Sequence, residues 1–297
     1  MPLPTTAVTA LPVTVNGVGR RFALRDGPDH VILRDVDLSI RSGEIIALLG
    51  ASGSGKSTLL RLIAGLDQAD AGTVEIGGIP VAEVDQRCAV AFQEPRLLPW
   101  RTVERNVHLG LPRGTERAAG VERVAELLRL VRLEPAAALR PRQISGGMAQ
   151  RASLARALAR GPGILLLDEP FGALDALTRL KMQDLLLDIH RAEPATILLV
   201  THDVDEALSL ADRIVLLGAD GDLPGSTIRA AIEVPGPRPR DRADLRLARL
   251  RAELLERLGV ASHHEPDYIT AAIRDRRGRG GSAPVAAGVE PTRPHTF

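Results

Sequence analysis

The feature that most constrains the fold of this 297-residue chain is a glycine-rich octapeptide between two patterns of regular structure. The octapeptide Gly50-Ala-Ser-Gly-Ser-Gly-Lys-Ser57 follows residues 44–49, which are apolar after the first and predict a short buried strand. Leucine and isoleucine then recur at helical spacing over residues 56–66. A strand that runs through such a loop into a helix is the context that a phosphate-binding loop requires.

Each residue type in this loop suits the binding of a nucleoside triphosphate. Glycines let the backbone amides turn inward around phosphate oxygens, and the following helix presents its positive end. Lys56, one of only two lysines in the chain, is expected to reach the β- and γ-phosphates, and Ser57 to ligate Mg²⁺. The alternative is a glycine-rich turn before an ordinary helix. The predicted contacts with ATP are Gly50, Ala51, Ser52, Gly53, Ser54, Gly55, Lys56, Ser57 and Thr58.

A second element of the same chemistry is the apolar run Ile164-Leu-Leu-Leu followed by Asp168 and Glu169. It predicts a buried strand that ends in two carboxylates at the edge where α/β sheets place their ligands. Asp168 is expected to support Mg²⁺ and Glu169 to orient the attacking water. The alternative is that the two acids only cap the next helix.

The remaining patterns predict an α/β fold with a mostly parallel core. Residues 13–22 and 31–40 read as an antiparallel entry sheet, and strand patterns return at 164–167, 197–200 and 214–217, each separated by a helical stretch. Between about 95 and 161 the strand signal vanishes and apolar residues recur at helical spacing, which predicts an inserted helical subdomain.

The chain divides into one main domain and appendages. Residues 1–12 are expected to form a flexible tail, 13–220 the main domain and 221–262 an extension with a helix over 242–258. After residue 218 the sequence is polar and rich in proline, and no strand is predicted there. Residues 263–297 contain too few large apolar side chains to pack and are expected to be disordered.

The composition restricts the setting in which the chain works. Its 38 basic and 37 acidic residues nearly cancel, so nucleic acid is not the expected partner. The single cysteine, Cys88, cannot form an internal disulfide, and the first residues lack the pattern of a secretory signal. No apolar run approaches the ~20 residues that a membrane-spanning helix needs. A cytoplasmic location is expected, with any membrane-spanning work left to another subunit.

The segment Ile144-Ser-Gly-Gly-Met-Ala-Gln-Arg151 resembles the signature of ATP-binding-cassette proteins. Other landmarks of that family follow the same order: Gln93 of the Q-loop, the Ala173-Leu174-Asp175 D-loop, and His202 after the predicted strand 197–200. The resemblance covers roughly residues 13–260. It implies a phosphate-loop nucleoside triphosphatase with ATP and Mg²⁺ as its cofactors.

The resemblance also implies that two copies of the chain enclose two nucleotides head to tail. Ser145, Gly146 and Gly147 begin a helix predicted over 146–160 and contact the ATP held by the other copy, as does Asp175. Glu169 is then the general base, assisted by His202, Lys56 and Gln93. Gln93, Ser57 and Asp168 hold Mg²⁺. Phe22 stands where an aromatic ring stacks on adenine; the alternative is a core phenylalanine on an edge strand.

The stretch from Phe92 to Val107 resembles importers of nitrate, sulfonates and taurine, and the whole chain is similar to ATPases of aliphatic sulfonate import. This implies membrane permease subunits, an extracytoplasmic solute-binding protein reached through them, and a peripheral place at the cytoplasmic face of the cell membrane. Leu97, Leu98 and Trp100 are expected to help receive the permease, unless Trp100 packs inside the helical subdomain. Another small solute, and a soluble cassette acting on nucleic acid or the ribosome, remain alternatives.

Overall fold

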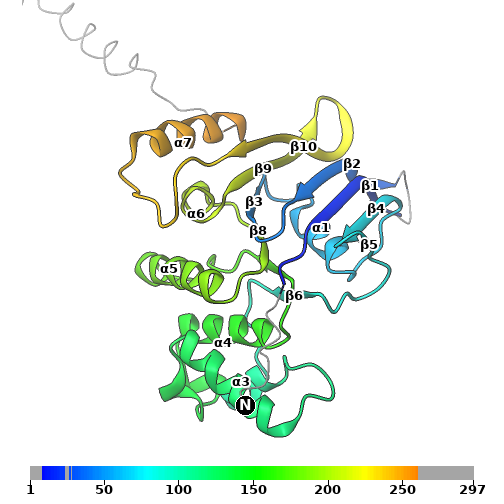
Figure 1. Cartoon of the computed structure of the whole chain (residues 1–297). Coiled ribbons are helices and arrows are strands. Elements are labelled where there is room, and N and C mark those ends of the chain that lie inside the picture. The colour runs from blue at the N-terminus through cyan, green and yellow to red at the C-terminus, as the bar shows by residue number, and fades with distance from the viewer. Residues whose placement is uncertain (1–8, 24–26, 28, 260–297) are drawn as a thin grey trace, which may run out of the picture. The chain divides into compact units, whose positions relative to one another are not determined.

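A ten-stranded mixed sheet organises the computed structural model, which describes residues 9–23, 27 and 29–259 (Figure 1). The order of strands across the sheet is β5-β4-β1-β2-β10-β9-β3-β8-β7-β6. The strands are β1 (Val13–Phe22), β2 (His30–Ile40), β3 (Ile45–Leu49), β4 (Ala71–Ile76), β5 (Ile79–Pro80), β6 (Cys88–Ala91), β7 (Ile164–Asp168), β8 (Thr196–Val200), β9 (Arg213–Asp220) and β10 (Leu223–Glu233).

The five strands β6, β7, β8, β3 and β9 run parallel to one another and form the predicted core. Every residue of β3 and β8 is buried, as expected for strands covered by helices on both faces. Because the strands are parallel, the segments that follow their carboxyl ends meet at one edge of the sheet. That edge receives Gly50 after β3, Asp168 at the end of β7, His202 after β8 and Gln93 after β6.

The antiparallel part contains β1, β2, β4 and β5, so the predicted entry sheet is confirmed. The reading of residues after 218 as a polar stretch without a strand is wrong, because β9 extends to Asp220 and β10 returns antiparallel beside it. A parallel pairing of Ser226 with Leu33 of β2 then places β10 inside the sheet. Most of β10 is partly or fully exposed, so its composition gives a weak strand signal although its backbone pairs with β9 over most of its length.

The helices are α1 (Lys56–Ile63), α2 (Val103–His108), α3 (Arg117–Leu130), α4 (Gly146–Leu158), α5 (Ala176–Ala192), α6 (Val204–Leu210) and α7 (Leu245–Arg257), with short 3₁₀ turns at Glu134–Ala136 and Pro141–Gln143. The helices α2, α3 and α4 contact one another beyond the β6 edge of the sheet, where Figure 1 shows α3 and α4 together. The expected inserted group of helices is therefore present. No helix in the described part of the chain is long and apolar enough to cross a membrane.

The two ends of the described chain are tied to the sheet. The Leu11 amide donates to the carbonyl oxygen of Gly163, before β7, and the Leu11 carbonyl accepts from the hydroxyl of Thr196, at the start of β8. Residue 11, expected to belong to a flexible tail, is therefore held against the sheet. At the other end, α7 packs on α6 through the buried Leu254 and a 2.8 Å contact between Arg251 Nε and Asp205 Oδ1. The predicted disordered tail, 263–297, lies outside the described residues.

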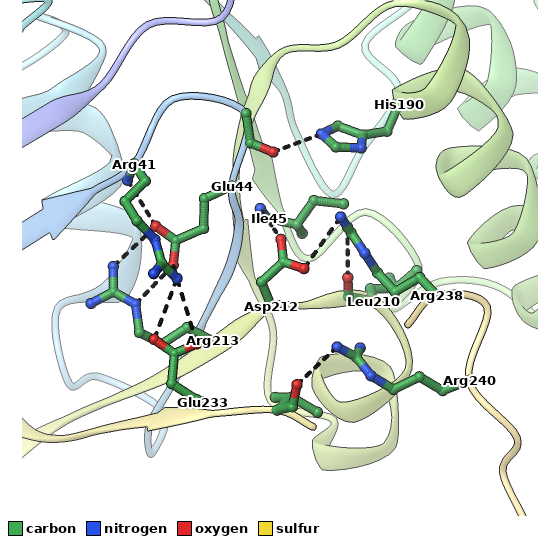
Figure 2. A network of polar contacts seen from close by, with 12 residues as sticks. Arg41, Glu44, Ile45, His190, Leu210, Asp212, Arg213, Glu233, Arg238 and Arg240 are labelled. Carbon is green, nitrogen blue, oxygen red and sulfur yellow. Dashed lines mark hydrogen bonds and ion pairs between the residues drawn. The ribbon is translucent and has the colours of Figure 1, made fainter. Parts of the chain in front are cut away.

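A polar network closes the amino edge of the parallel strands, opposite the loops described above (Figure 2). Glu44, just before β3, is only 3% exposed in its side chain and accepts hydrogen bonds from the guanidinium groups of Arg41 and Arg213. Asp212, just before β9, accepts from the backbone amide of Ile45 at 2.9 Å and pairs with Arg238 at 3.3 Å. Because Arg238 follows β10, this network fixes the extension to the start of two core strands.

Candidate nucleotide site

The phosphate-loop sequence forms a turn whose backbone amides remain available at the start of α1. Gly55 is the residue before the helix, has φ of 89° and provides no side chain to cap the first turn. A Cβ atom at Gly55 would approach Leu33 Cδ2 to 2.8 Å, and one at Gly50 would lie 2.3 Å from the carbonyl oxygen of Leu217. Glycine is therefore required at both positions by close packing, and at Gly55 also by its backbone conformation.

The side chain of Lys56 lies within this loop. Its side chain is almost fully buried, and its ammonium group donates to the carbonyl oxygens of Gly50 and Ala51 at 2.9 Å each. Burial lowers the pKa of Lys56, while the nearby carboxylates of Glu169 and Asp168 oppose that change. The amine thus has two neutral acceptors from its own loop and two carboxylates in its electrostatic surroundings.

The loop also contains a buried polar atom that lacks a hydrogen-bond partner. Ser54 Oγ is shielded from solvent and unpaired, which costs about 1–3 kcal/mol if nothing satisfies it. Such an atom, beside free helix-start amides and a lysine amine, fits an anionic group with several acceptor oxygens. The residues present therefore fit a polyphosphate, and the alternative of an ordinary glycine-rich turn does not explain them.

The two carboxylates after the core strand face different partners. Asp168 Oδ1 accepts a 2.9 Å hydrogen bond from Ser57 Oγ, so the end of β7 meets the start of α1. Glu169 has φ of +46°, a strained value for a residue with a side chain. Its Oε2 lies 3.2 Å from His202 Nδ1. The side chain that caps α5 belongs to Asp175, so the alternative in which Asp168 and Glu169 only cap that helix is wrong.

Gln93 reaches the same edge from β6. Its Nε2 lies 3.4 Å from the Cβ position that a side chain at Gly172 would take, and Glu169 Oε2 lies 3.8 Å from that same point. The absent side chain at Gly172 leaves space that both functional groups adjoin. Gln150 on α4 donates to the carbonyl oxygen of Phe92 at 3.3 Å and so holds the residue before Gln93. Sequence reasoning missed Gln150 and Gly172, since neither has a local pattern that indicates its partner.

The segment that resembles a family signature opens α4. Ser145 caps this helix by accepting from the amide of Met148 at 3.3 Å, and Gly146 is exposed. A Cβ at Gly147 would lie 2.7 Å from Thr178 Cγ2, so the first turn of α4 approaches the first turn of α5, which Asp175 caps. The structure thus brings the predicted partner-facing groups of the two helices together.

Phe22 and Trp100, for each of which a packed interior position was the alternative, are both exposed. Phe22, at the end of β1, is 42% exposed, and the guanidinium of Arg20 lies 4.4 Å from its ring centroid. Trp100 is 67% exposed, so packing inside the helical group is wrong for this residue. Phe22 is likewise no core residue, and both rings present apolar surface to solvent.

The sheet, the loop and the paired acids are those of a phosphate-loop nucleotide-hydrolysing domain. A family model described as "ABC transporter" matches residues 33–172. The aliphatic sulfonates import ATP-binding protein SsuB 1 of Streptomyces avermitilis is 51% identical over 248 residues, covering 84% of this chain and 86% of the relative. The corresponding SsuB of Escherichia coli is 45% identical over 254 residues, covering 86% and 93%.

A solved structure supports the same conclusion. The dimeric ATP-binding cassette MJ0796 in a post-hydrolysis state with ADP and Pi aligns with a TM-score of 0.66 and 32% identity, over 76% of this chain and all of the other. The chain therefore belongs to the ABC transporter family of ATP-binding proteins. Its nucleotide site is an ATP site, and the expected fold class is confirmed.

Proposed function

We propose that this chain is the ATP-hydrolysing subunit of an importer for aliphatic sulfonates, bound to its permease at the cytoplasmic face of the membrane. ATP hydrolysis is supported by one observation: a single edge of the sheet brings together Lys56, the Ser57–Asp168 pair and the Glu169–His202 pair. The import part is supported by relatives that cover at least 84% of this chain and are named for sulfonate import.

Binding of ATP uses groups that are already in place. The free amides at the start of α1 and the hydroxyl of Ser54 offer donors to phosphate oxygens, and the Lys56 amine can exchange its two loop carbonyls for the β- and γ-oxygens. Thr58, Ser52 and Gly53 complete the predicted loop contacts. Phe22 offers an exposed ring for stacking on adenine.

We propose that Ser57 and Asp168 hold Mg²⁺, with Gln93 as a further oxygen ligand. Hydroxyl, carboxylate and amide oxygens are hard donors of the kind that Mg²⁺ takes. The 2.9 Å hydrogen bond between Ser57 and Asp168 shows that their oxygens reach one another. When bound, the ion neutralises charge on the β- and γ-phosphate oxygens.

We propose that Glu169 accepts a proton from the attacking water. Its strained backbone is held by two hydrogen bonds, from its own amide to Val200 O at 2.9 Å and from the Gly172 amide to its carbonyl at 3.2 Å. His202 lies against the carboxylate through Nδ1 and orients it, and its side chain is 64% exposed, so the rest of the ring can face a phosphate. The strain therefore serves to aim the general base.

We propose that two copies of the chain complete each other's sites. Ser145, Gly146 and Gly147 present the amino end of α4, and Asp175 lies on the adjoining start of α5. An exposed helix start suits the γ-phosphate held by a second copy. The dimeric state of the similar cassette MJ0796 supports this arrangement.

The permease surface is proposed to lie beside α2. A groove of about 280 Å³ is lined by exposed Leu66, Val84 and Leu109 together with Phe92, which adjoins Gln93. Exposed Trp100 lines a neighbouring hollow with Arg105 and His108. Exposed apolar side chains near the Q-loop suit a partner whose binding must reach the nucleotide site. An extracytoplasmic solute-binding protein would act only through that permease.

The test of hydrolysis is Glu169→Gln. This variant is expected to bind ATP, accumulate as a nucleotide-bound dimer and lose at least about 100-fold in turnover, because the base is gone and the phosphate cradle remains. Glu253→Gln, an exposed position in an α7 ion pair, is the control and should hydrolyse normally. Undiminished hydrolysis by Glu169→Gln would contradict the assignment.

The test of the solute is growth of a deletion strain with alkanesulfonates, taurine or sulfate as the only sulfur source. Loss of growth on alkanesulfonates alone, restored by the wild-type chain and not by Glu169→Gln, is the expected result. Loss on taurine alone would identify a different solute for the same motor.

A further inference from the structure

Arg179, in the first turn of α5, connects two loops of the nucleotide site. Its Nη1 donates to Asp203 Oδ2 at 3.0 Å, and its Nη2 donates to the carbonyl oxygen of Leu174 at 3.3 Å. Leu174 precedes Asp175 in the loop before α5, and Asp203 directly follows His202. One planar guanidinium therefore spans the loop proposed to face the second copy and the segment that carries the histidine beside Glu169.

The residues on both sides of His202 are fixed by a second set of contacts. Thr201 Oγ1 donates to Glu206 Oε2 at 2.7 Å and accepts from the amide of Asp203 at 3.0 Å. Asp203 Oδ1 also caps α6 by accepting from the amides of Asp205 and Glu206. The buried Glu206 carboxylate lies 3.7 Å from Arg179 Nε. His202 is thus held through its neighbours: Asp203 contacts Arg179 directly, and Thr201 contacts Glu206, whose carboxylate lies near Arg179.

Polar contacts rather than close packing determine where the Arg179 head group lies. A cavity of about 410 Å³ adjoins it, lined also by Leu180, Gln183, Leu208 and Leu247. Its Nε is shielded from solvent and makes no hydrogen bond. The group is therefore oriented by the two donors that reach Asp203 and Leu174.

We propose that Arg179 is a positioning residue for ATP hydrolysis, which keeps the loop at 173–175 and the segment at 201–203 in fixed relation. This role rests on the proposed function, in which Glu169 and His202 act on the terminal phosphate. His202 Nδ1 lies 3.2 Å from Glu169 Oε2, and a shift of about 1 Å in such a group can cost on the order of 100-fold in rate. The side chain of Arg179 contacts no predicted ATP-binding residue in the hydrogen bonds and ion pairs of the described chain.

The experiment compares Arg179→Gln, Arg179→Lys and Asp203→Asn in the full chain, with kcat, KM for ATP and thermal melting measured for each. Arg179→Gln is expected to lower kcat about 10-fold with KM for ATP within about 2-fold of wild type. Arg179→Lys should recover part of kcat, because its point charge still pairs with Asp203 but cannot span both acceptors. Asp203→Asn keeps the helix cap and removes the charge, and should lower kcat similarly.

The control is Arg191→Gln, on the same helix, where an exposed arginine pairs with exposed Asp188 and with no other residue that the structure describes. Its kcat should equal that of wild type. The double variant Arg179→Gln/Asp203→Asn should lose no more than the larger single change, since both changes remove the contact between Arg179 and Asp203. Wild-type kcat in a folded Arg179→Gln protein, additive losses, or parallel losses of melting temperature and ATP affinity would overturn the positioning role. If wild type and Arg191→Gln do not hydrolyse ATP, the proposed function itself fails.

Discussion

Replacing Glu44 by glutamine should destabilise the protein while leaving its ATP site intact. The Glu44 carboxylate accepts from the Arg41 amide at 2.7 Å, from the Arg41 guanidinium at 3.2 Å and from Arg213 Nε at 2.8 Å. Its side chain is 3% exposed and that of Arg213 is 17% exposed. Glutamine keeps the shape but leaves Arg213 without a charged partner in a largely buried position.

The expected loss is about 2–4 kcal/mol, because breaking a buried pair by removing one partner costs about 3–5 kcal/mol and the glutamine oxygen retains part of the hydrogen bonding. At about 2–4 °C per kcal/mol for a domain of this size, the melting temperature should fall by roughly 5–15 °C. The network lies at the amino edge of the core strands, opposite the phosphate loop, so the affinity for ATP should not change.

The contacts of Glu44 with Arg213 and Arg41 also predict how the stability of the protein depends on pH. Although burial raises the pKa of Glu44, hydrogen bonds from Arg213 and the Arg41 amide outweigh it and hold this pKa below its ordinary value. A carboxylate with a lowered folded-state pKa contributes its full stability above the unfolded-state pKa of about 4.3 and loses it as the pH falls towards the folded-state pKa. The gap in melting temperature between wild type and Glu44→Gln should therefore be full at pH 7 and shrink below about pH 4.3.

The assay is thermal melting of both proteins from pH 7 downward, with ATP binding measured at pH 7. Glu253→Gln, which breaks an exposed pair with Arg257 on α7, is the matched control and should change stability by less than about 0.5 kcal/mol. The reasoning would be refuted if Glu44→Gln melted within 2 °C of wild type at pH 7. It would also be refuted if the difference in melting temperature between the two proteins were the same at pH 7 and pH 3.5.

Two further predictions concern the site and the core. Gly50→Ala should abolish ATP binding, because its Cβ would lie 2.3 Å from Leu217 O and 2.7 Å from Ser54 Oγ and so must displace the loop. Gly53→Ala has a Cβ that meets nothing within 4 Å but a φ of +80°, so it should bind ATP more weakly than wild type and more tightly than Gly50→Ala. Titration with a fluorescent nucleotide measures both affinities. Burial raises the pKa of Cys88 to about 12. A thiol reagent at pH 8 should therefore label Cys88 slowly in the native protein and at once in the denatured protein. Rapid labelling of the native protein would contradict this prediction.

Much of the site was predictable because each of its motifs is a short, local pattern in the sequence. The phosphate loop needs only a strand, eight residues and a helix, and β3, the loop and α1 appear where the pattern places them. The same holds for β7 and the acids Asp168 and Glu169, since an apolar run determines where that strand ends. The start of α4 at Gly146 was likewise predicted from its own residues.

Errors arose where the local signal was weak. The strand β10 was missed because its residues are mostly half-exposed, so neither a continuous apolar run nor a strict alternation marks it. Its identity comes from backbone pairing with β9, a property of the neighbour rather than of its own side chains. Helix ends were also extended too far: the helix from Lys56 ends at Ile63, and Leu66, expected on its apolar face, is 46% exposed.

The sequence by itself determined the class of this protein and predicted the chemistry of its site: a loop for phosphate and, as proposed above, a carboxylate for Mg²⁺ and a base for water. Only the tertiary structure decided which of these groups meet. The 3.2 Å contact of His202 with Glu169, the approach of Gln93 to Gly172 and the span of Arg179 from Leu174 to Asp203 depend on strands β6, β7, β8 and β3 lying side by side and parallel. That order is set by burial of the parallel strands between helices, a cooperative property that no short stretch of residues contains.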